Sequence, residues 1–197
     1  RKTRVFTDAG FVVGDFIAVE KARAHYLKNV LRLKPGAAFF LFNGREAIDY
    51  EARLIIEGKR LTAEILATRP LATESALTSE IIQGLGRADH MDWTIQKTTE
   101  VGVNRISIFN AARSQSPLKA TQLEKKLAHW RGVAISACEQ CGRAIVPDIE
   151  FHAGLEAALA AAAGTCKLIL DFAGEPLASS LEPSGPSVSI LLGPEGG

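Results

Sequence analysis

The hydrophobic pattern of this 197-residue chain changes between residues 69 and 75, and the change predicts two domains. Before it, short β-type segments are separated by turn residues such as Pro35-Gly36 and Asn43-Gly44. Asn-Gly between apolar runs is a strong hairpin signal, and several short strands at this spacing indicate a small barrel. After it, strands alternate with helices, as in α/β folds whose helices pack on a mostly parallel sheet. We therefore predict a β-barrel domain over residues 1–72 and an α/β domain over residues 73–197.

The individual elements are predicted from the same pattern. In the first domain we expect one helix over residues 21–33 and strands over residues 11–13, 16–19, 37–42, 47–56 and 61–68. In the second we expect helices over residues 88–101, 119–142 and 155–163 and strands over residues 77–83, 105–110, 167–171 and 188–192. Asp89 is placed to cap the first of these helices, and Gly164 follows the last at a favoured C′ position. The long helix has one apolar side that should face the core, made of Leu123, Leu127, Trp130, Ala134 and Cys138.

The two predicted domains differ in charge. Up to residue 72 the chain has 13 Lys and Arg against 8 Asp and Glu, a net charge of +5, and the remainder has 10 against 14, a net charge of −4. This asymmetry fits a first domain that meets a polyanion, although scattered surface charge would produce it as well. Four potential cations of the expected helix share one face at spacings of i, i+4, i+7 and i+11: Lys21, His25, Lys28 and Arg32. A phosphate backbone is a natural counterpart for that face, and the alternative is an ordinary solvated surface.

Two short motifs suggest chemistry that their surroundings do not support. Gly84-Leu85-Gly86 follows a strand and opens a helix like a dinucleotide fingerprint, but Asp89 stands where the sixth position requires glycine. Cys138 and Cys141 have C-x-x-C spacing, but zinc needs two more ligands, and a helix C-terminus disfavours a thiolate. We therefore predict no metal site and interpret Cys138 as a core residue. A thiol redox protein that uses both cysteines is the alternative.

Composition also bounds where the protein works. No apolar run approaches the roughly 18 residues that a membrane span needs. The basic start, Arg1 to Arg4, is followed by too short an apolar segment for a signal peptide. Three cysteines cannot all pair, which indicates a reducing, cytoplasmic setting.

A glycine-rich loop follows the last predicted strand, and its sequence is Leu192-Gly193-Pro194-Glu195-Gly196-Gly197. Glycine lets the backbone approach a ligand closely, and such a loop after an apolar strand is a common place for a cofactor. Other polar residues gather at the ends of predicted elements: Arg87, Lys97, Glu100, Arg113, Ser114, Glu139, Gln140 and Arg143. Lys97 and Glu100 are three residues apart on one helix, so a salt bridge is the simpler interpretation of that pair.

Four segments together resemble one known family: His25–Gly36, Met91–Val103, Ala137–Arg143 and Leu192–Gly197. In this order they are similar to the ribosomal RNA small subunit methyltransferase E family. Its members are SPOUT-class enzymes that transfer a methyl group from S-adenosylmethionine to N3 of a uridine in 16S rRNA. The resemblance implies a PUA-like β-barrel that binds RNA, a C-terminal α/β domain with a trefoil knot, and a homodimer that acts on 16S rRNA or the small ribosomal subunit. A non-catalytic RNA-binding module of the same architecture is the alternative.

The resemblance also implies roles for particular residues. Cofactor binding is expected for Leu170, Leu192, Gly193, Pro194, Glu195, Gly196 and Gly197. Arg113 and Arg143 are the candidate catalytic residues, able to stabilise negative charge on the uracil, and no general base is assigned. RNA binding is expected for Arg4, Lys21, Arg23, His25, Lys28, Arg32, Arg87, Lys97 and Gln140.

The chain departs from the family pattern at two places. A Glu-Arg-Ser pattern of the family is Ala112-Arg113-Ser114 here, so an acidic role at Ala112 is unavailable. The family also continues past the glycine pair with a helix and a second loop that close the knot, and this segment is absent here. We therefore expect the SPOUT-type domain within these residues to be truncated before its knot closes.

Overall fold

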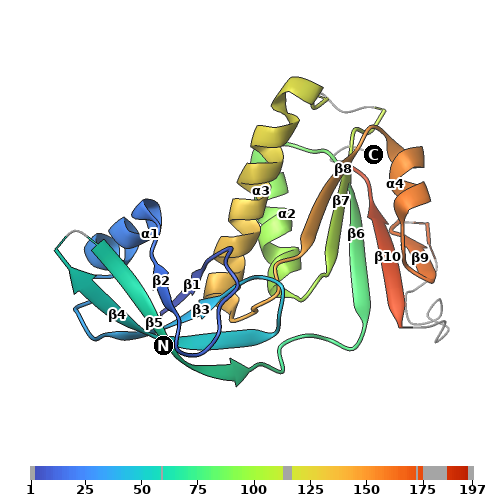
Figure 1. Ribbon diagram of the computed structural model, residues 1–197. Helices are drawn as coiled ribbons and strands as arrows, with labels where there is room; N and C mark the ends of the chain where they lie inside the picture. The colour runs from blue at the N-terminus through green and yellow to red at the C-terminus, as the bar shows by residue number, and fades with distance from the viewer. Residues whose placement is uncertain (1–2, 59, 113–116, 172, 175–185, 195–197) are drawn as a thin grey trace. The chain divides into compact units, whose positions relative to one another are not determined.

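The computed structural model describes residues 3–58, 60–112, 117–171, 173–174 and 186–194, and its contacts divide the chain into two compact units (Figure 1). Unit 1 comprises Arg1–Glu74 and Cys138–Ile145, and unit 2 comprises Ser75–Ala137 and Val146–Gly197. The units differ from the expected division at two places, because residues 73–74 and 138–145 group with the N-terminal part of the chain.

Unit 1 is built on a five-stranded sheet in the order β1-β3-β4-β5-β2. Its strands are β1 (Arg4–Phe6), β2 (Phe16–Ala18), β3 (Ala38–Phe42), β4 (Ile48–Glu57) and β5 (Arg60–Pro70). β1 pairs with β3 in parallel, and the other neighbours are antiparallel. β1 was not expected from the sequence, and the strand expected over residues 11–13 is wrong. A turn lies there instead, because the Asp15 carboxylate accepts a hydrogen bond from the Val12 amide and the Asp15 amide donates to the Val12 carbonyl.

The helix expected over residues 21–33 is shorter and changes type along its length. An α-helix, α1, covers Lys21–His25, and a π-helix, η1, follows over Tyr26–Val30. Arg32 lies beyond both, with a left-handed φ of 51°. The predicted common face of the four cations assumed one continuous α-helix, and a π turn advances the chain by a different angle per residue. The spacing argument for a single basic face is therefore wrong.

The core of unit 1 lies against one face of this sheet. Leu27 of η1 is fully buried, and the Phe11 and Tyr50 rings meet edge to face with centroids 4.3 Å apart. The remaining buried members of this cluster come mainly from the strands: Val5, Phe39, Leu41, Ala52, Leu54, Leu61, Ala63 and Ile65. Alternation along β4 and β5 places these side chains on one face, as the period of two in the sequence predicts.

Unit 2 contains a second five-stranded sheet, in the order β8-β7-β6-β10-β9. Its strands are β6 (Thr78–Gly84), β7 (Arg105–Phe109), β8 (Asp148–His152), β9 (Cys166–Ile169) and β10 (Ser187–Leu192). Every neighbouring pair is parallel, which confirms the parallel α/β fold predicted from the alternation of elements. β8 was not expected from the sequence.

Three helices cover the two faces of this sheet (Figure 1). α2 (Ala88–Glu100) and the unit 2 part of α3 (Ala120–Cys141) run alongside each other, and α4 (Leu155–Ala161) packs on the other face. On the α4 side, Ile82, Phe109 and Ala158 form a buried cluster. Buried Ile106 and Ile108 alternate with Phe109 along β7 and therefore point to the α2 side.

Two predicted helix ends need correction. α2 begins after Arg87 and has no side-chain cap bond, so Asp89, inside its first turn, is not the N-cap. α4 ends at Ala161 with Ala162 as its C-cap, so Gly164 lies one residue beyond the C′ position.

Gly164 has a packing role instead. A Cβ at Gly164 would lie 2.3 Å from the Ser189 amide nitrogen, far inside contact distance. The close approach lets the Gly164 amide donate to Ser189 Oγ at 2.9 Å. Ser189 in turn donates to the buried Glu80 carboxylate at 2.6 Å, which also accepts from Ser107 Oγ and the Ala163 amide. This buried network joins β6, β7 and β10 to the segment after α4, and its bonds offset the cost of burying the Glu80 carboxylate.

Candidate functional site

The order of the strands in unit 2 defines a point where the chain reverses its direction of winding. From β6 the chain adds β7 and then β8 on one side, and it later returns to add β10 beside β6 on the other side. In open parallel sheets, ligands bind at the carboxyl ends of the strands at such a switch point. Gly84 ends β6 and Leu192 ends β10, so the segments that follow these residues form the candidate site.

At the switch point the loop after β10 lies directly on the end of β6. A Cβ at Gly84 would lie 2.7 Å from Pro194 Cδ and 2.8 Å from the Pro194 backbone nitrogen. Only glycine permits this separation, because carbon atoms at contact stand about 3.5–4.0 Å apart. The Gly-Leu-Gly turn thus serves close packing of two backbone segments.

Gln83, the residue before Gly84, bonds to both segments. Its Nε2 donates to the Gly84 carbonyl oxygen at 2.9 Å and to the Gly193 carbonyl oxygen at 3.1 Å. Leu85 is tied to the next strand, since its amide donates to the Phe109 carbonyl at 2.8 Å. Gln83 and Leu85, two residues of one short turn, therefore connect the ends of β6, β7 and β10.

Exposed apolar side chains lie at the end of β9, on the other side of β10 from this turn. The Leu170 amide donates to the Leu191 carbonyl at 3.3 Å, which sets Leu170 next to the end of β10. Ile169 and Leu170 are 70% and 61% exposed, and a Cβ at Gly193 would meet nothing within 4 Å. Apolar side chains beside an open stretch of backbone suit a ligand with a flat apolar part and polar groups that bond to main chain.

Four residues predicted to bind the cofactor are therefore close to one another along this edge: Leu170, Leu192, Gly193 and Pro194. Glu195, Gly196 and Gly197 lie outside the described residues, as does the predicted catalytic residue Arg113. The described flanks of the Arg113 segment are held at the end of β7. The Leu118 amide donates to Asn110 Oδ1 at 2.9 Å, and Asn110 Nδ2 donates to the Leu118 carbonyl at 3.2 Å.

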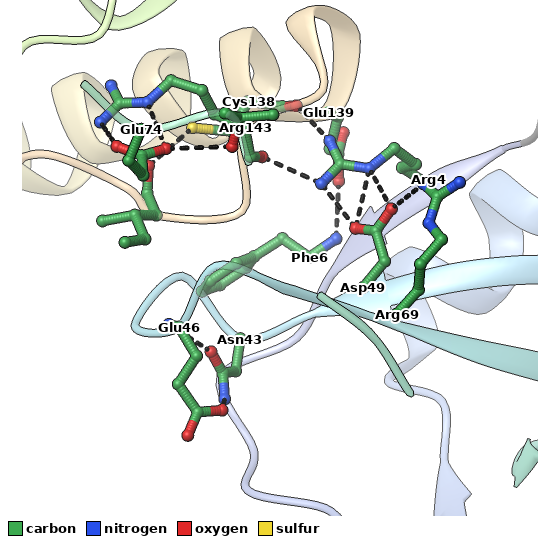
Figure 2. A network of polar contacts seen from close by, with 12 residues as sticks. Arg4, Phe6, Asn43, Glu46, Asp49, Arg69, Glu74, Cys138, Glu139 and Arg143 are labelled. Carbon is green, nitrogen blue, oxygen red and sulfur yellow. Dashed lines mark hydrogen bonds and ion pairs between the residues drawn. The ribbon is translucent and has the colours of Figure 1, made fainter. Parts of the chain in front are cut away.

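In unit 1, a polar network binds residues 138–145 to the sheet (Figure 2). Arg4 donates to the fully buried Asp49 carboxylate at 2.7 Å, and Arg69 donates to the same carboxylate at 2.7 Å. Arg4 also donates to the carbonyl oxygens of Cys138 at 2.6 Å and Arg143 at 3.0 Å. The Cys138 carbonyl lies in the last turn of α3, where the helix dipole favours a cation, so Arg4 stabilises the end of α3.

The predicted catalytic residue Arg143 is part of the same network. Its guanidinium group is 4% exposed and pairs with Glu74 through two bonds, Nε to Oε1 at 3.1 Å and Nη2 to Oε2 at 2.6 Å (Figure 2). A two-pronged arginine–carboxylate pair fixes geometry as well as charge. The contacts of Arg143 hold residues 138–145 in unit 1, and its catalytic role stays a prediction.

The residues predicted to bind RNA divide into two groups. Arg4 and Arg23 are engaged inside unit 1, Arg23 through Glu139 at 2.9 Å. Arg87 and Lys97 pair with acidic residues of α2, at 3.4 Å and 2.8 Å. The side chain of Lys21 is not among those that the structure describes. His25, Lys28, Arg32 and Gln140 are exposed, and Arg87 is also exposed although it pairs with Asp89.

The cysteines are free thiols with different surroundings. Cys138 is fully buried, as its place in the apolar stripe predicts, and burial raises the pKa of its thiol to about 12. Its Sγ donates to the Ile145 carbonyl at 3.4 Å. Cys141 is exposed. A thiol held protonated is a poor nucleophile, which counts against redox chemistry at Cys138.

Two further findings concern the part of the chain that the structure describes. Within it, no helix is long and apolar enough to cross a membrane. The same residues contain no group of three or more His, Cys, Asp or Glu side chains arranged to hold a metal ion.

Comparison with known proteins assigns the family. The model of the RNA methyltransferase domain matches residues 73–197, and the model of the RNA methyltransferase PUA domain matches residues 19–66. A crystal structure of a ribosomal RNA small subunit methyltransferase E from Neisseria gonorrhoeae, bound to S-adenosyl methionine, is 31% identical with a TM-score of 0.91, and the match covers 100% of this chain and 81% of that one.

The chain belongs to the ribosomal RNA small subunit methyltransferase E family. This confirms the resemblance found in the sequence, together with the α/β fold and the PUA-like domain. A methyltransferase from Legionella pneumophila, solved with bound SAM, has a TM-score of 0.92 at 27% identity and covers 100% of this chain and 81% of that chain.

Curated relatives agree with this assignment. The family member from Buchnera aphidicola of Schizaphis graminum is 30% identical over 150 residues, which are 76% of this chain and 61% of the relative. The Bacillus subtilis member is 27% identical over 184 residues, which are 88% of this chain and 71% of the relative. The chain thus spans about 60% of the length of the Buchnera relative.

Sequence reasoning missed the contribution of Gln83 and Gly84 to this site. The Gly84-Leu85-Gly86 motif was compared with a dinucleotide fingerprint, and its role in seating Pro194 depends on a contact between residues more than a hundred positions apart. The strand expected over residues 77–83 ended at Gln83, and nothing local marks its amide as a link to Gly193.

Proposed function

We propose that this protein methylates N3 of a uridine in the 16S rRNA of the small ribosomal subunit, with S-adenosylmethionine as methyl donor. The observation that carries the proposal is the switch-point edge of unit 2, where the Gly193–Pro194 segment rests on Gly84 beside exposed Leu170. Two related methyltransferases of the same fold were solved with this donor bound. A non-catalytic RNA-binding module would not need an edge built in this way.

The residues at this edge fit the donor. Leu170 and Leu192 offer apolar surface to the adenine ring, and the backbone around Gly193 and Pro194 is open to the polar parts of the molecule. The bound donor supplies a methyl group already activated by the sulfonium charge. The chain must align that group with the uracil nitrogen and exclude water, which is worth several powers of ten in rate.

The proton on uridine N3 must leave during the transfer, and the negative charge that develops on the uracil needs a donor or cation nearby. Arg113 is our candidate for that stabilising charge. We assign Arg143 a supporting role, because its guanidinium is buried against Glu74. No general base is assigned.

Unit 1 is proposed to hold the rRNA. His25, Lys28 and Arg32 are exposed on and after the α1–η1 segment, and no ion pair involves Lys28 or Arg32 among the described residues. Phosphate contacts of this kind position a substrate, while the base itself is recognised elsewhere. Gln140 is exposed at the end of α3 and is proposed to contact the RNA as well.

The finer architecture implied by the family is part of the same proposal: a SPOUT-type trefoil knot in the α/β domain and a homodimer with composite active sites. The parallel sheet with its switch point between β6 and β10 supports this topology. A reducing, cytoplasmic setting is proposed from the free cysteines and from the rRNA substrate.

The test is mass spectrometry of 16S rRNA from cells with and without the gene. The proposal predicts that one N3-methyluridine is lost on deletion and restored by the wild-type gene. A 16S rRNA modification pattern that does not change on deletion would contradict it and would favour the RNA-binding module.

A further inference from the structure

We propose that Gln83 is a positioning residue for the donor-binding loop, because its side-chain amide holds the loop after β10 onto the end of β6. The inference rests on the proposed function and concerns the same site. It assigns a role to a residue whose side-chain hydrogen bonds go to backbone carbonyls and which is not part of any of the sequence motifs.

The geometry makes Gln83 a bridge between two segments distant in sequence. Gln83 and Leu192 are paired in the parallel register of β6 and β10, so the Gln83 side chain stands beside the residue where the loop begins. Its single NH₂ group uses both hydrogens, one on the Gly84 carbonyl at 2.9 Å and one on the Gly193 carbonyl at 3.1 Å. Both acceptors are main-chain atoms, so the bonds fix the path of the backbone itself.

The backbone ladder of the sheet does not reach the loop, so a side chain must hold the loop onto β6. The regular ladder between β6 and β10 ends at the pair Gln83–Leu192, and Gly193 and Pro194 continue beyond it. Proline has no amide hydrogen, so Pro194 cannot donate a bond back to β6. The Gln83 amide therefore extends the ladder by one bond at the point where the backbone turns toward the donor.

The contact between Pro194 and Gly84 restricts movement of the loop toward β6 but not away from it. Pro194 is seated where a Cβ of residue 84 would be, so the loop can approach β6 closely but can still lift away from it. The bond from Gln83 to Gly193 opposes that lifting. An ordered loop needs to lose less freedom when a ligand binds, so the bridge should strengthen donor binding by preorganisation.

The experiment uses the whole chain with four substitutions. Gln83→Ala removes the amide, Gln83→Met keeps its length without donors, and Gln83→Glu replaces the donors by acceptors. Gln96→Ala is the matched control, because Gln96 is exposed on α2 and its amide donates only within that helix, to Glu100 at 2.9 Å. Two quantities are measured for each: hydrogen–deuterium exchange of the Leu191–Gly193 amides without ligand, and calorimetric affinity for S-adenosylmethionine.

We expect faster exchange at Leu191–Gly193 and about tenfold weaker donor binding for Gln83→Ala and Gln83→Met, a loss of roughly 1.4 kcal/mol. Gln83→Glu should be weaker still at neutral pH, because a carboxylate would face two carbonyl oxygens. Their proximity raises the pKa of that carboxyl group, and its protonated form can donate one bond. Binding by Gln83→Glu should therefore recover as the pH falls, a response that a purely structural role would not give.

The outcomes separate the two proposals. Unchanged exchange and unchanged affinity in all Gln83 variants would overturn the bridge and leave the methyltransferase function standing. Faster exchange with unchanged affinity would also overturn it as a positioning device. If the unsubstituted chain does not bind the donor while exchange responds to Gln83, the proposed function is overturned, and Gln83 is shown only to order the loop.

Discussion

Gly84 offers the sharpest test of the switch-point packing. In Gly84→Ala the new Cβ would stand 2.7 Å from Pro194 Cδ and 2.8 Å from Pro194 N. A comfortable separation is about 3.5–4.0 Å, so one of the two segments must move by about 1 Å. Both atoms belong to a ring or to the backbone and cannot rotate away as a flexible side chain would. Forcing a group into a packed site of this kind costs about 1–3 kcal/mol of folding free energy.

The matched control for this substitution is Gly132→Ala. Gly132 lies within α3, and a Cβ there would meet nothing within 4 Å. Alanine in an exposed helix interior is more stable than glycine by up to about 1 kcal/mol. Urea unfolding of the two variants should therefore give changes of opposite sign, with weaker S-adenosylmethionine binding in Gly84→Ala alone. If Gly84→Ala unfolds within about 0.5 kcal/mol of the wild type and binds the donor equally well, the close approach of Pro194 has no energetic weight.

Three further predictions concern other parts of the chain. Replacing both Lys28 and Arg32 by alanine should weaken 16S rRNA binding and reduce the slope of log affinity against log salt concentration by about 1.5, since each phosphate contact contributes about 0.7–0.9 to that slope. An unchanged slope in filter-binding measurements over a series of salt concentrations would argue against their role. With iodoacetamide at pH 8, mass spectrometry should find Cys141 alkylated quickly and Cys138 only on unfolding, because burial raises the pKa of Cys138 to about 12; equal rates would show that its burial is wrong. Hydrogen bonds from the side chains of Asn43 and Tyr50 lower the pKa of the Glu46 carboxyl group in the folded state. Glu46 therefore stabilises the fold at a pH above its unfolded pKa, and this stabilisation is lost as the pH falls through the folded pKa. Glu46→Gln should flatten the acid side of a plot of unfolding temperature against pH, and an unchanged acid side would contradict the assignment.

Much of the fold could be predicted because it depends on local patterns. The alternation of apolar residues located β3, β4 and β5 closely, and the helical period located α2 and α3 to within one or two residues. The parallel arrangement of the second sheet followed from strand–helix alternation and the general rules for such units. The apolar stripe of α3 correctly marked Trp130, Ala134 and Cys138 as buried.

The failures have non-local causes. β1 contains only three residues and exists because it pairs with β3, more than thirty positions away. The π-helix at Tyr26–Val30 places Leu27 in the core, and helical periodicity alone contains no signal for a change of pitch. The four cations therefore looked like one face in the sequence, although that spacing does not survive the change of pitch.

The charged residues of unit 1 illustrate the same limit at the level of function. Arg4 looked like part of a basic, RNA-facing N-terminus, yet its guanidinium is nearly buried between Asp49 and two carbonyls of residues 138–143 (Figure 2). Arg143 matched the family pattern as a pocket residue, yet it forms a buried pair with Glu74. Composition counts such charges as free, and only the structure shows which of them are already neutralised by a partner.

The claim on which the account depends is that the methyl donor binds at the carboxyl edge between β6 and β10. Two-dimensional amide NMR of the chain, titrated with S-adenosylmethionine, tests it directly. The account predicts saturable shifts at Leu85, Leu170, Leu192 and Gly193, with β3 to β5 of unit 1 unaffected. Shifts confined to unit 1, or none at any donor concentration, would contradict it.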